Sequence, residues 1–195
     1  ALSALAHAHG GYLFADVIQA AGAVPIDVLA LGIDFLACSA YKWLMGGRFG
    51  YLYVPVELQG SVFQQKHFGG RSSQPGAGRY QVSTASHLGC VCQHESLQYI
   101  LRLGVENIQA HNLVLNRRLR KELPRLGYEC LTPLEAPTPI STFRLRNGQE
   151  VRKRLGRAGA VVTLRLGQRE SQMRVSPSVF NHLGDIDRFI AALAA

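Results

Sequence analysis

Three short, largely apolar runs constrain the fold of this chain most. They are residues 12–15, 35–39 and 51–54, and none of them alternates regularly between apolar and polar residues. Continuous apolar character is typical of strands covered on both faces, whereas alternation indicates a strand with one face in water. Short helical segments are expected between the runs, at residues 17–22 and again from Pro25. The pattern predicts an α/β fold with a mostly parallel sheet.

The rest of the chain predicts a helical region followed by a small α+β unit. Residues 1–9 are expected to end a helix, residues 65–86 to form a loop, and residues 87–126 to be helical with an interruption at Gly104. Beyond them the periodicity predicts strands at residues 140–145, 161–166 and 173–176, and helices at residues 149–158 and 185–193. We expect a domain boundary near residue 105.

Composition excludes several classes of protein. The chain has 195 residues, of which 47% are apolar and 17% charged, which is a globular balance. No apolar run approaches the roughly 20 residues of a membrane span, and no signal peptide is visible. The first residue is not Met and falls inside an expected helix, so we expect a fragment. Four cysteines without zinc-ligand spacing (Cys38, Cys90, Cys92 and Cys130) are expected to be reduced core thiols, with no metal site, in the cytoplasm.

The positive charge is concentrated in one stretch. The net charge is +8, and fifteen of the 21 Lys and Arg residues lie between Arg102 and Arg174. A basic face can bind nucleic acid, but the aromatic residues of a base-stacking platform are missing and glutamates are interspersed. Solvated helix faces therefore explain the charge better than a nucleic-acid groove.

One lysine stands in an apolar run where a charge is costly. Lys42 follows the expected strand at residues 35–39, and Asp16 ends the expected strand before it. If Lys42 is buried, its amine is favoured in the neutral form, which can attack an aldehyde. Ligands of open α/β sheets bind outside the carboxyl ends of the strands, where Asp16 would lie. An amine for an aldehyde and an acid for a pyridine nitrogen together indicate pyridoxal phosphate (PLP).

Two neighbouring polar residues extend this interpretation. Gln19 lies three residues after Asp16, on the same side of a helical turn, where it could bond the ring oxygen. Ser39 lies three residues before Lys42, where its hydroxyl could meet a phosphate oxygen. Taken singly, Asp16 and Ser39 could be helix caps, and Lys42 could extend from a strand end into water. The joint spacing supports the cofactor site.

Three segments carry a resemblance to a known family. Residues 16–28, 32–44 and 46–54 resemble the class V aminotransferase-like group of fold-type I PLP enzymes. That group includes cysteine desulfurases, selenocysteine lyases, kynureninases and isopenicillin-epimerase-like proteins. The resemblance implies a PLP-dependent enzyme that acts on an amino acid.

The resemblance also implies roles for single residues. Lys42 would be the aldimine lysine and proton shuttle, and Asp16 would be the partner of the ring nitrogen. Gln19 would contact the ring hydroxyl and Ser39 the phosphate. Tyr41 stands where many relatives carry a phosphate-contacting histidine.

Two later segments extend the resemblance. Residues 79–84 are similar to a segment of the family whose threonine, here Thr84, reaches the phosphate in the partner subunit, which implies a homodimer. Ser83 replaces the usual glycine of that segment. Residues 173–187 resemble the family's ending, in which Arg174 would bind the substrate carboxylate.

The resemblance covers only the C-terminal portion of the family's enzyme. It implies that residues 1–105 form the C-terminal part of the PLP-binding large domain and residues 106–195 the small C-terminal domain. The preceding phosphate-binding loop and ring-stacking residue are missing, so we expect weak PLP binding or none.

The reaction subclass rests on a missing cysteine. Residues 163–173 hold no cysteine where desulfurases carry their nucleophile, which favours a transaminase, epimerase or lyase. Two alternatives remain open. One is a non-catalytic remnant or interaction module of the same fold, and the other, ranked below it, is a basic nucleic-acid-binding domain.

Overall fold

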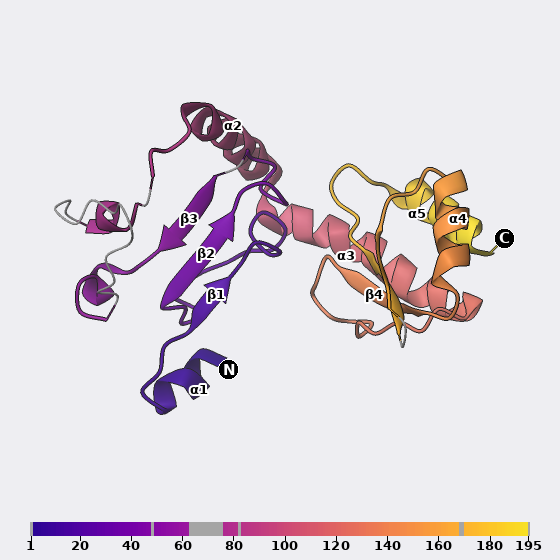
Figure 1. Cartoon of the computed structure of the whole chain (residues 1–195), viewed down its shortest axis with the longest axis horizontal. Coiled ribbons are helices and arrows are strands. Elements are labelled where there is room, and N and C mark those ends of the chain that lie inside the picture. Colours follow the sequence, from indigo (N-terminus) through magenta and orange to yellow (C-terminus); the bar gives the residue numbers. More distant parts are fainter. Residues whose placement is uncertain (1, 48, 63–75, 82, 168–169, 195) are drawn as a thin grey trace. The chain divides into compact units, whose positions relative to one another are not determined.

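The computed structural model describes residues 2–47, 49–62, 76–81, 83–167 and 170–194. The chain divides into two compact units, residues 1–105 and 106–195, which are described separately below. Figure 1 shows the elements of each unit.

The first unit is built on a three-stranded sheet. Its elements are α1 (Leu2–Ala8), β1 (Phe14–Asp16), β2 (Phe35–Ser39), β3 (Gly50–Tyr53), the 3-10 turns η1 (Val56–Leu58) and η2 (Gly76–Tyr80), and α2 (His87–Leu103). The strands lie in the order β1-β2-β3 (Figure 1). β1 runs parallel to β2, with Asp16 opposite Ala37, and β2 runs antiparallel to β3, with Ser39 opposite Gly50.

The expected mostly parallel sheet needs a correction. Among the described residues, only β1 and β2 form a parallel pair in this sheet. Parallel neighbours require a crossover of about a dozen residues or more, whereas a shorter link can simply reverse the chain. Residues 40–49 join β2 to β3, and they are too few for a crossover. The apolar run therefore gave the position of β3 but not its direction, and the residues of β3 are half-buried or exposed.

Asp34 ties the start of the first unit to β2. Its Oδ2 accepts a hydrogen bond from Leu13 N at 2.7 Å and lies 2.8 Å from His7 Nε2, at the end of α1. Leu13 O in turn accepts from Phe35 N at 3.1 Å. Partial burial would raise the pKa of Asp34, but the bonds from His7 and Leu13 outweigh it and hold the pKa below its ordinary value of 3.8.

Replacing Asp34 by alanine should therefore destabilise the protein in a pH-dependent way. A carboxylate whose pKa is lowered by folding stabilises the fold above its unfolded-state pKa, and that contribution is lost as the pH falls through the folded-state value. We expect a loss of about 1.5–3 kcal/mol at pH 7, as for hydrogen bonds to a charged group. Urea unfolding at pH 7 and pH 3 should show the difference from wild type shrinking in acid. A difference equal at both pH values would contradict this role.

In the described part of the second unit, three helices pack on a second sheet. Its elements are α3 (Val105–Glu122, whose first residue belongs to the first unit), the 3-10 turn η3 (Leu123–Leu126), β4 (Ser141–Leu145), α4 (Gly148–Arg157), β5 (Thr163–Leu166), β6 (Ser171–Val175) and α5 (Leu183–Ala194). The strand order is β4-β6-β5, and both pairs are antiparallel. Its core contains four side chains that are almost fully buried, namely Leu119 of α3, Phe143 of β4, Leu155 of α4 and Met173 of β6.

The sequence placed most elements within a few residues. The strand expected at residues 35–39 is confirmed without a shift as β2. The helical region from residue 87 to 126 is confirmed as α2, α3 and η3, divided at Gly104, where φ is +80° and glycine is favoured. Of the loop expected at residues 65–86, residues 65–75 and 82 lie outside the described part, and Gly76–Tyr80 forms η2.

A buried arginine organises the loop before β4. Arg120 of α3 is 3% exposed, and its Nε donates to Ser141 Oγ at 2.8 Å. Its two other nitrogens donate to five backbone carbonyls of that loop, those of Pro133, Leu134, Ala136, Thr138 and Ile140. One turn earlier, Asn116 accepts from Ser141 Oγ at 2.6 Å and donates to Pro139 O at 2.9 Å. We call Arg120, Asn116 and Ser141 the arginine clamp.

The exposed arginines of the second unit are largely paired with acids. Arg117 lies 3.3 Å from Glu135, and Arg118 contacts both Glu122 and Asp187. Such pairs are typical of a solvated helix face rather than of a groove for nucleic acid. Among the described residues, no helix is both long enough and apolar enough to span a membrane.

Candidate functional site

Asp16 and Ser39 lie at the same edge of the first sheet. Asp16 ends β1, Ser39 ends β2, and the two strands are paired in parallel, so both residues lie at carboxyl ends. The Asp16 side chain is exposed, and its Oδ1 accepts a hydrogen bond from Ile18 N at 3.0 Å. Burial, and after it the charge of Asp16, raises the pKa of the Cys38 thiol beside it. A carboxylate and a hydroxyl thus face the region where α/β sheets bind ligands.

Lys42 lies in the link that leaves this edge. We call residues 40–49, which join β2 to β3, the lysine loop. Its turn is closed by Met45 N donating to Lys42 O at 2.9 Å and by Gly46 N donating to Ala40 O at 2.9 Å. Lys42 is half-buried rather than buried, and its Nζ lies 5.8 Å from the centroid of the Tyr41 ring, within the range of a cation–π contact.

A groove opens beside Ser39 and the lysine loop. It has a volume of about 590 Å³ and is lined by Ser39, Tyr41, Phe49 and Gly50. Ser39 Oγ donates to Phe49 O at 3.4 Å, a long bond that a better acceptor could replace. The hydroxyl is therefore available to a ligand in the groove.

The two remaining predicted residues of the first unit are Gln19 and Thr84. Gln19 is half-buried in the turn after β1, on the segment that Asp16 begins. Thr84 is exposed just before α2, whose N-cap is Ser86. The structure brings Asp16, Ser39, Tyr41 and Lys42 to one edge, whereas no described contact links Thr84 to them.

Arg174 belongs to the second unit. It lies on β6, opposite Thr142 of β4 and Thr163 of β5, and its Nη2 donates to Thr163 Oγ1 at 3.1 Å. Its Nε is buried and has no hydrogen-bond partner in the described part of the chain. An unpaired guanidinium donor suits an anionic ligand.

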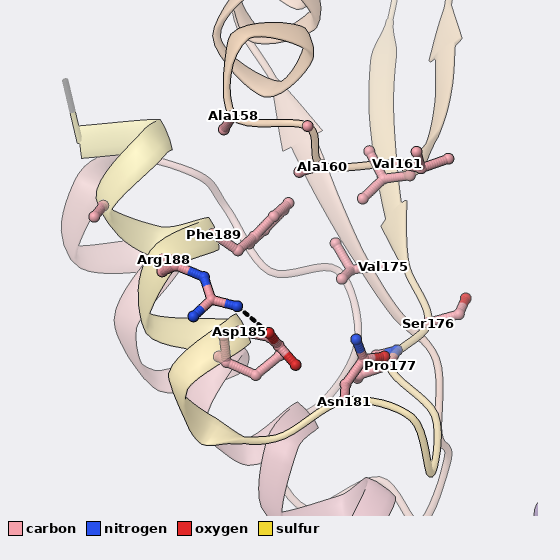
Figure 2. A pocket seen from close by; sticks show the side chains of 14 residues that line it. Ala158, Ala160, Val161, Val175, Ser176, Pro177, Asn181, Asp185, Arg188 and Phe189 are labelled. Atoms are coloured by element: carbon pink, nitrogen blue, oxygen red, sulfur yellow. Dashed lines mark hydrogen bonds and ion pairs between the residues drawn. The ribbon is translucent and has the colours of Figure 1, made fainter.

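A different groove of the second unit holds none of the predicted residues. It has a volume of about 690 Å³ and is lined by the link from α4 to β5, the end of β6 and α5. Figure 2 shows Phe189 and Val175 facing it, with the ion pair between Arg188 and Asp185 at its side.

Sequence reasoning missed two polar residues that contact the lysine loop. Ser96 and Gln93 lie on α2, and Ser96 Oγ donates to Met45 O at 3.0 Å. Gly89, Gln93 and Ser96 recur at helical spacing, which could have indicated a helix face of small and polar residues.

The described residues contain no cluster of three or more His, Cys, Asp or Glu that could hold a metal ion. The expectation of core thiols is met only in part. Cys38 is buried, Cys90 and Cys130 are half-buried, and Cys92 is exposed on α2.

The chain is similar over its whole length to PLP enzymes. The profile of the family described as aminotransferase class-V matches residues 1–189. A cysteine desulfurase of Klebsiella pneumoniae is 26% identical, covering 99% of this chain and 53% of that protein. An uncharacterized aminotransferase of Bacillus subtilis, YcbU, is 31% identical, covering 57% of this chain and 32% of that protein.

Solved structures share the fold at lower identity. The apo structure of a cysteine desulfurase from Thermococcus onnurineus has a TM-score of 0.87 at 22% identity, covering 99% of this chain and 54% of that one. An alanine–glyoxylate aminotransferase from Nostoc sp. has a TM-score of 0.79 at 20% identity, covering 99% and 55%.

The chain therefore belongs to the class-V aminotransferase family, whose members are PLP-dependent enzymes. It spans about half the length of the two solved relatives above and of the Klebsiella protein.

Proposed function

We propose that this chain carries the lysine-bearing part of a PLP-dependent enzyme that acts on an amino acid. The observation that carries the proposal is the parallel pair β1 and β2, whose carboxyl ends place Asp16 and Ser39 at one edge, with Lys42 directly after them. This arrangement supplies a carboxylate, a hydroxyl that can donate a hydrogen bond to phosphate, and an amine within one short stretch of the fold.

The residues at this edge fit PLP. Lys42 supplies the amine for its aldehyde, Asp16 the carboxylate for its ring nitrogen, and Gln19 an amide for its ring oxygen. Ser39 and the position of Tyr41 border the groove in which the phosphate would bind, and about 590 Å³ is an ordinary size for a small-molecule site. When bound, PLP withdraws electrons from the bond that breaks at the substrate Cα.

The protein groups have separate tasks. The bond from Ile18 N orients the Asp16 carboxylate, which would keep the ring nitrogen protonated by its charge. Once freed from its covalent bond, the Lys42 amine would move a proton to or from the substrate Cα. The cation–π contact with the Tyr41 ring, at 5.8 Å, would help to keep the Lys42 amine at this edge.

Arg174 is proposed to bind the substrate carboxylate through its unpaired Nε and the neighbouring nitrogen. Replacing Arg174 by glutamine should raise KM about 10- to 100-fold, because a hydrogen bond to a charged group is worth about 1.5–3 kcal/mol. The loss should appear in KM more than in kcat, measured by steady-state kinetics with an amino-acid substrate.

The matched control for Arg174 is Arg165→Gln. Arg165 is exposed on β5, the strand beside β6, so its replacement should leave KM unchanged. Equal effects of the two replacements would contradict a specific role for Arg174.

We extend the proposal to the assembly. Residues 1–105 would be the C-terminal part of the PLP-binding large domain and residues 106–195 the small C-terminal domain of a cytoplasmic homodimer. Thr84, exposed before α2, would then reach the phosphate bound by the partner subunit.

Two observations support a transaminase, epimerase or lyase rather than a cysteine desulfurase. Between β5 and β6, Gly167 N donates to Glu170 O at 3.1 Å, and the sequence of residues 167–170 contains no cysteine. Cys130, the single cysteine of residues 106–195, is half-buried, and burial raises the pKa of its thiol. A desulfurase needs an accessible cysteine that ionises readily.

The proposal is tested by trapping PLP on the natural polypeptide that contains this sequence. Borohydride reduction in the presence of PLP, followed by peptide mass mapping, should locate the cofactor on Lys42 and not on Lys121 or Lys153, which are exposed on α3 and α4. If Lys42 is not labelled above these two, the non-catalytic alternative replaces the proposal.

The reaction subclass needs a separate assay. Purified protein with PLP should convert one or more amino acids without releasing sulfide or sulfane sulfur from L-cysteine. Catalytic release of sulfane sulfur, with alanine as the other product, would overturn the choice against a desulfurase and leave the PLP assignment intact.

A further inference from the structure

One face of α2 lies against the lysine loop. Ser96 Oγ donates to Met45 O at 3.0 Å, sharing its one hydrogen with Cys92 O at 2.8 Å. Gln93 packs against Gly46 so closely that a Cβ on Gly46 would lie 1.9 Å from Gln93 Oε1. One turn earlier, a Cβ on Gly47 would lie 3.7 Å from Gly89 Cα. These residues of α2 recur four and three positions apart, so they share one face of the helix.

The backbone that α2 contacts is the backbone that closes the turn on Lys42. Met45 N donates to Lys42 O, and Gly46 N donates to Ala40 O, each at 2.9 Å. Met45 has a φ of +54°, a left-handed conformation that is unfavourable for a residue with a side chain. The surrounding structure must hold such a residue in place, and the bond from Ser96 to its carbonyl is one direct restraint.

Gln93 is an unusual residue for its position. It is 3% exposed, and neither its Nε2 nor its Oε1 has a hydrogen-bond partner in the described part of the chain. A buried amide without a partner is unfavourable, and methionine could fill the same space without that penalty. Packing alone therefore does not explain why the side chain is polar.

We propose that Gln93 and Ser96 are positioning residues for Lys42. Ser96 holds the Met45 peptide, and the Gln93 amide pairs with backbone groups of Gly46 and Gly47 when Lys42 bonds to PLP. The two adjacent glycines allow their peptide groups to turn toward the amide, because they lack the side chains that restrict backbone rotation. The proposal rests on the function proposed above and adds the helix that sets the geometry of the Lys42 amine.

The test compares Lys42 labelling with folding stability in the same variants. In the natural polypeptide that contains this sequence, PLP trapped by borohydride is measured at Lys42 relative to Lys121 and Lys153. Gln93→Met should raise the urea midpoint of unfolding, because the unpaired amide is gone, yet lower the labelling of Lys42 about fivefold, the effect of one hydrogen bond. A residue that acts through packing alone would not produce these opposite changes.

Ser96 is tested by its own pair of variants. Ser96→Ala should lower the relative labelling of Lys42 about fivefold and speed amide hydrogen exchange in residues 43–47. Ser96→Thr keeps the hydroxyl and should restore labelling toward wild type. The matched control is Gln98→Met, at an exposed position of α2, which should change neither labelling nor exchange.

The outcomes separate this inference from the proposed function. If wild-type protein shows no preference for Lys42, the proposed function fails and this inference fails with it. If wild type prefers Lys42 and both Gln93→Met and Ser96→Ala keep that preference, the positioning role is overturned and the proposed function stands.

Discussion

Replacing Lys42 by alanine should abolish specific PLP attachment and lower kcat by about 10²–10⁴-fold, the range of general acid–base catalysis. Lys42 is the amine that follows the edge formed by Asp16 and Ser39, and the two other described lysines, Lys121 and Lys153, are exposed in the second unit. The measurement is the mass of PLP-labelled peptides together with turnover of an amino-acid substrate. The fold should survive, because Lys42 makes no ion pair with a described residue.

Two further variants make this prediction specific. Lys42→Arg keeps a positive charge beside Tyr41 but has no nucleophilic amine, so it should be as inactive as Lys42→Ala. Lys153→Ala removes an exposed lysine of α4 and should leave labelling and turnover unchanged. Turnover at the wild-type rate in Lys42→Ala, or turnover restored in Lys42→Arg, would contradict covalent chemistry at this residue.

Replacing Arg120 by alanine should unfold the second unit far more easily. The buried Ser141 hydroxyl and five loop carbonyls, whose bonds to Arg120 are partly buried, would lose their donor. We expect a loss of about 3–5 kcal/mol, as when one partner of a buried charged network is removed. For a unit of this size, thermal unfolding should shift down by more than about 10 °C.

The arginine clamp also predicts how other variants behave. Arg120→Lys should be nearly as unstable, because one ammonium cannot reach carbonyls that a planar guanidinium contacts from several nitrogens. Arg117→Ala is the control, since the pair of Arg117 with Glu135 is exposed and should contribute less than about 1 kcal/mol. If Arg120→Ala and Arg117→Ala unfold at similar temperatures, the clamp does not stabilise the loop.

Local signals in the sequence explain why most elements were predictable. The apolar run at residues 35–39 and the glycine at 104 act through burial and backbone conformation, which depend on a few adjacent residues. The direction of β3, in contrast, could not be predicted from the residues of the strand itself. It depended on the length of the lysine loop, and apolar character alone carries no information about strand direction.

The residues of the candidate site likewise include some that the sequence identified and others that it did not. Asp16, Ser39 and Lys42 could be named from the sequence, because each lies at or shortly after a strand end that the apolar pattern marks. Gln93 could not be named from the sequence, because its contact with the lysine loop depends on which face of α2 turns inward. Helical spacing predicts that a face exists but not what it contacts.

The sequence by itself determined the family, the order of the strands along the chain and the stretch in which Lys42 lies. Those features depend on residues that are close together in the chain. Only the tertiary structure decided that Gln93 packs on Gly46 and that Arg120 donates to five carbonyls of one loop. Such contacts join segments far apart in the chain, and their geometry is set by close packing, which the sequence pattern of either segment alone does not specify.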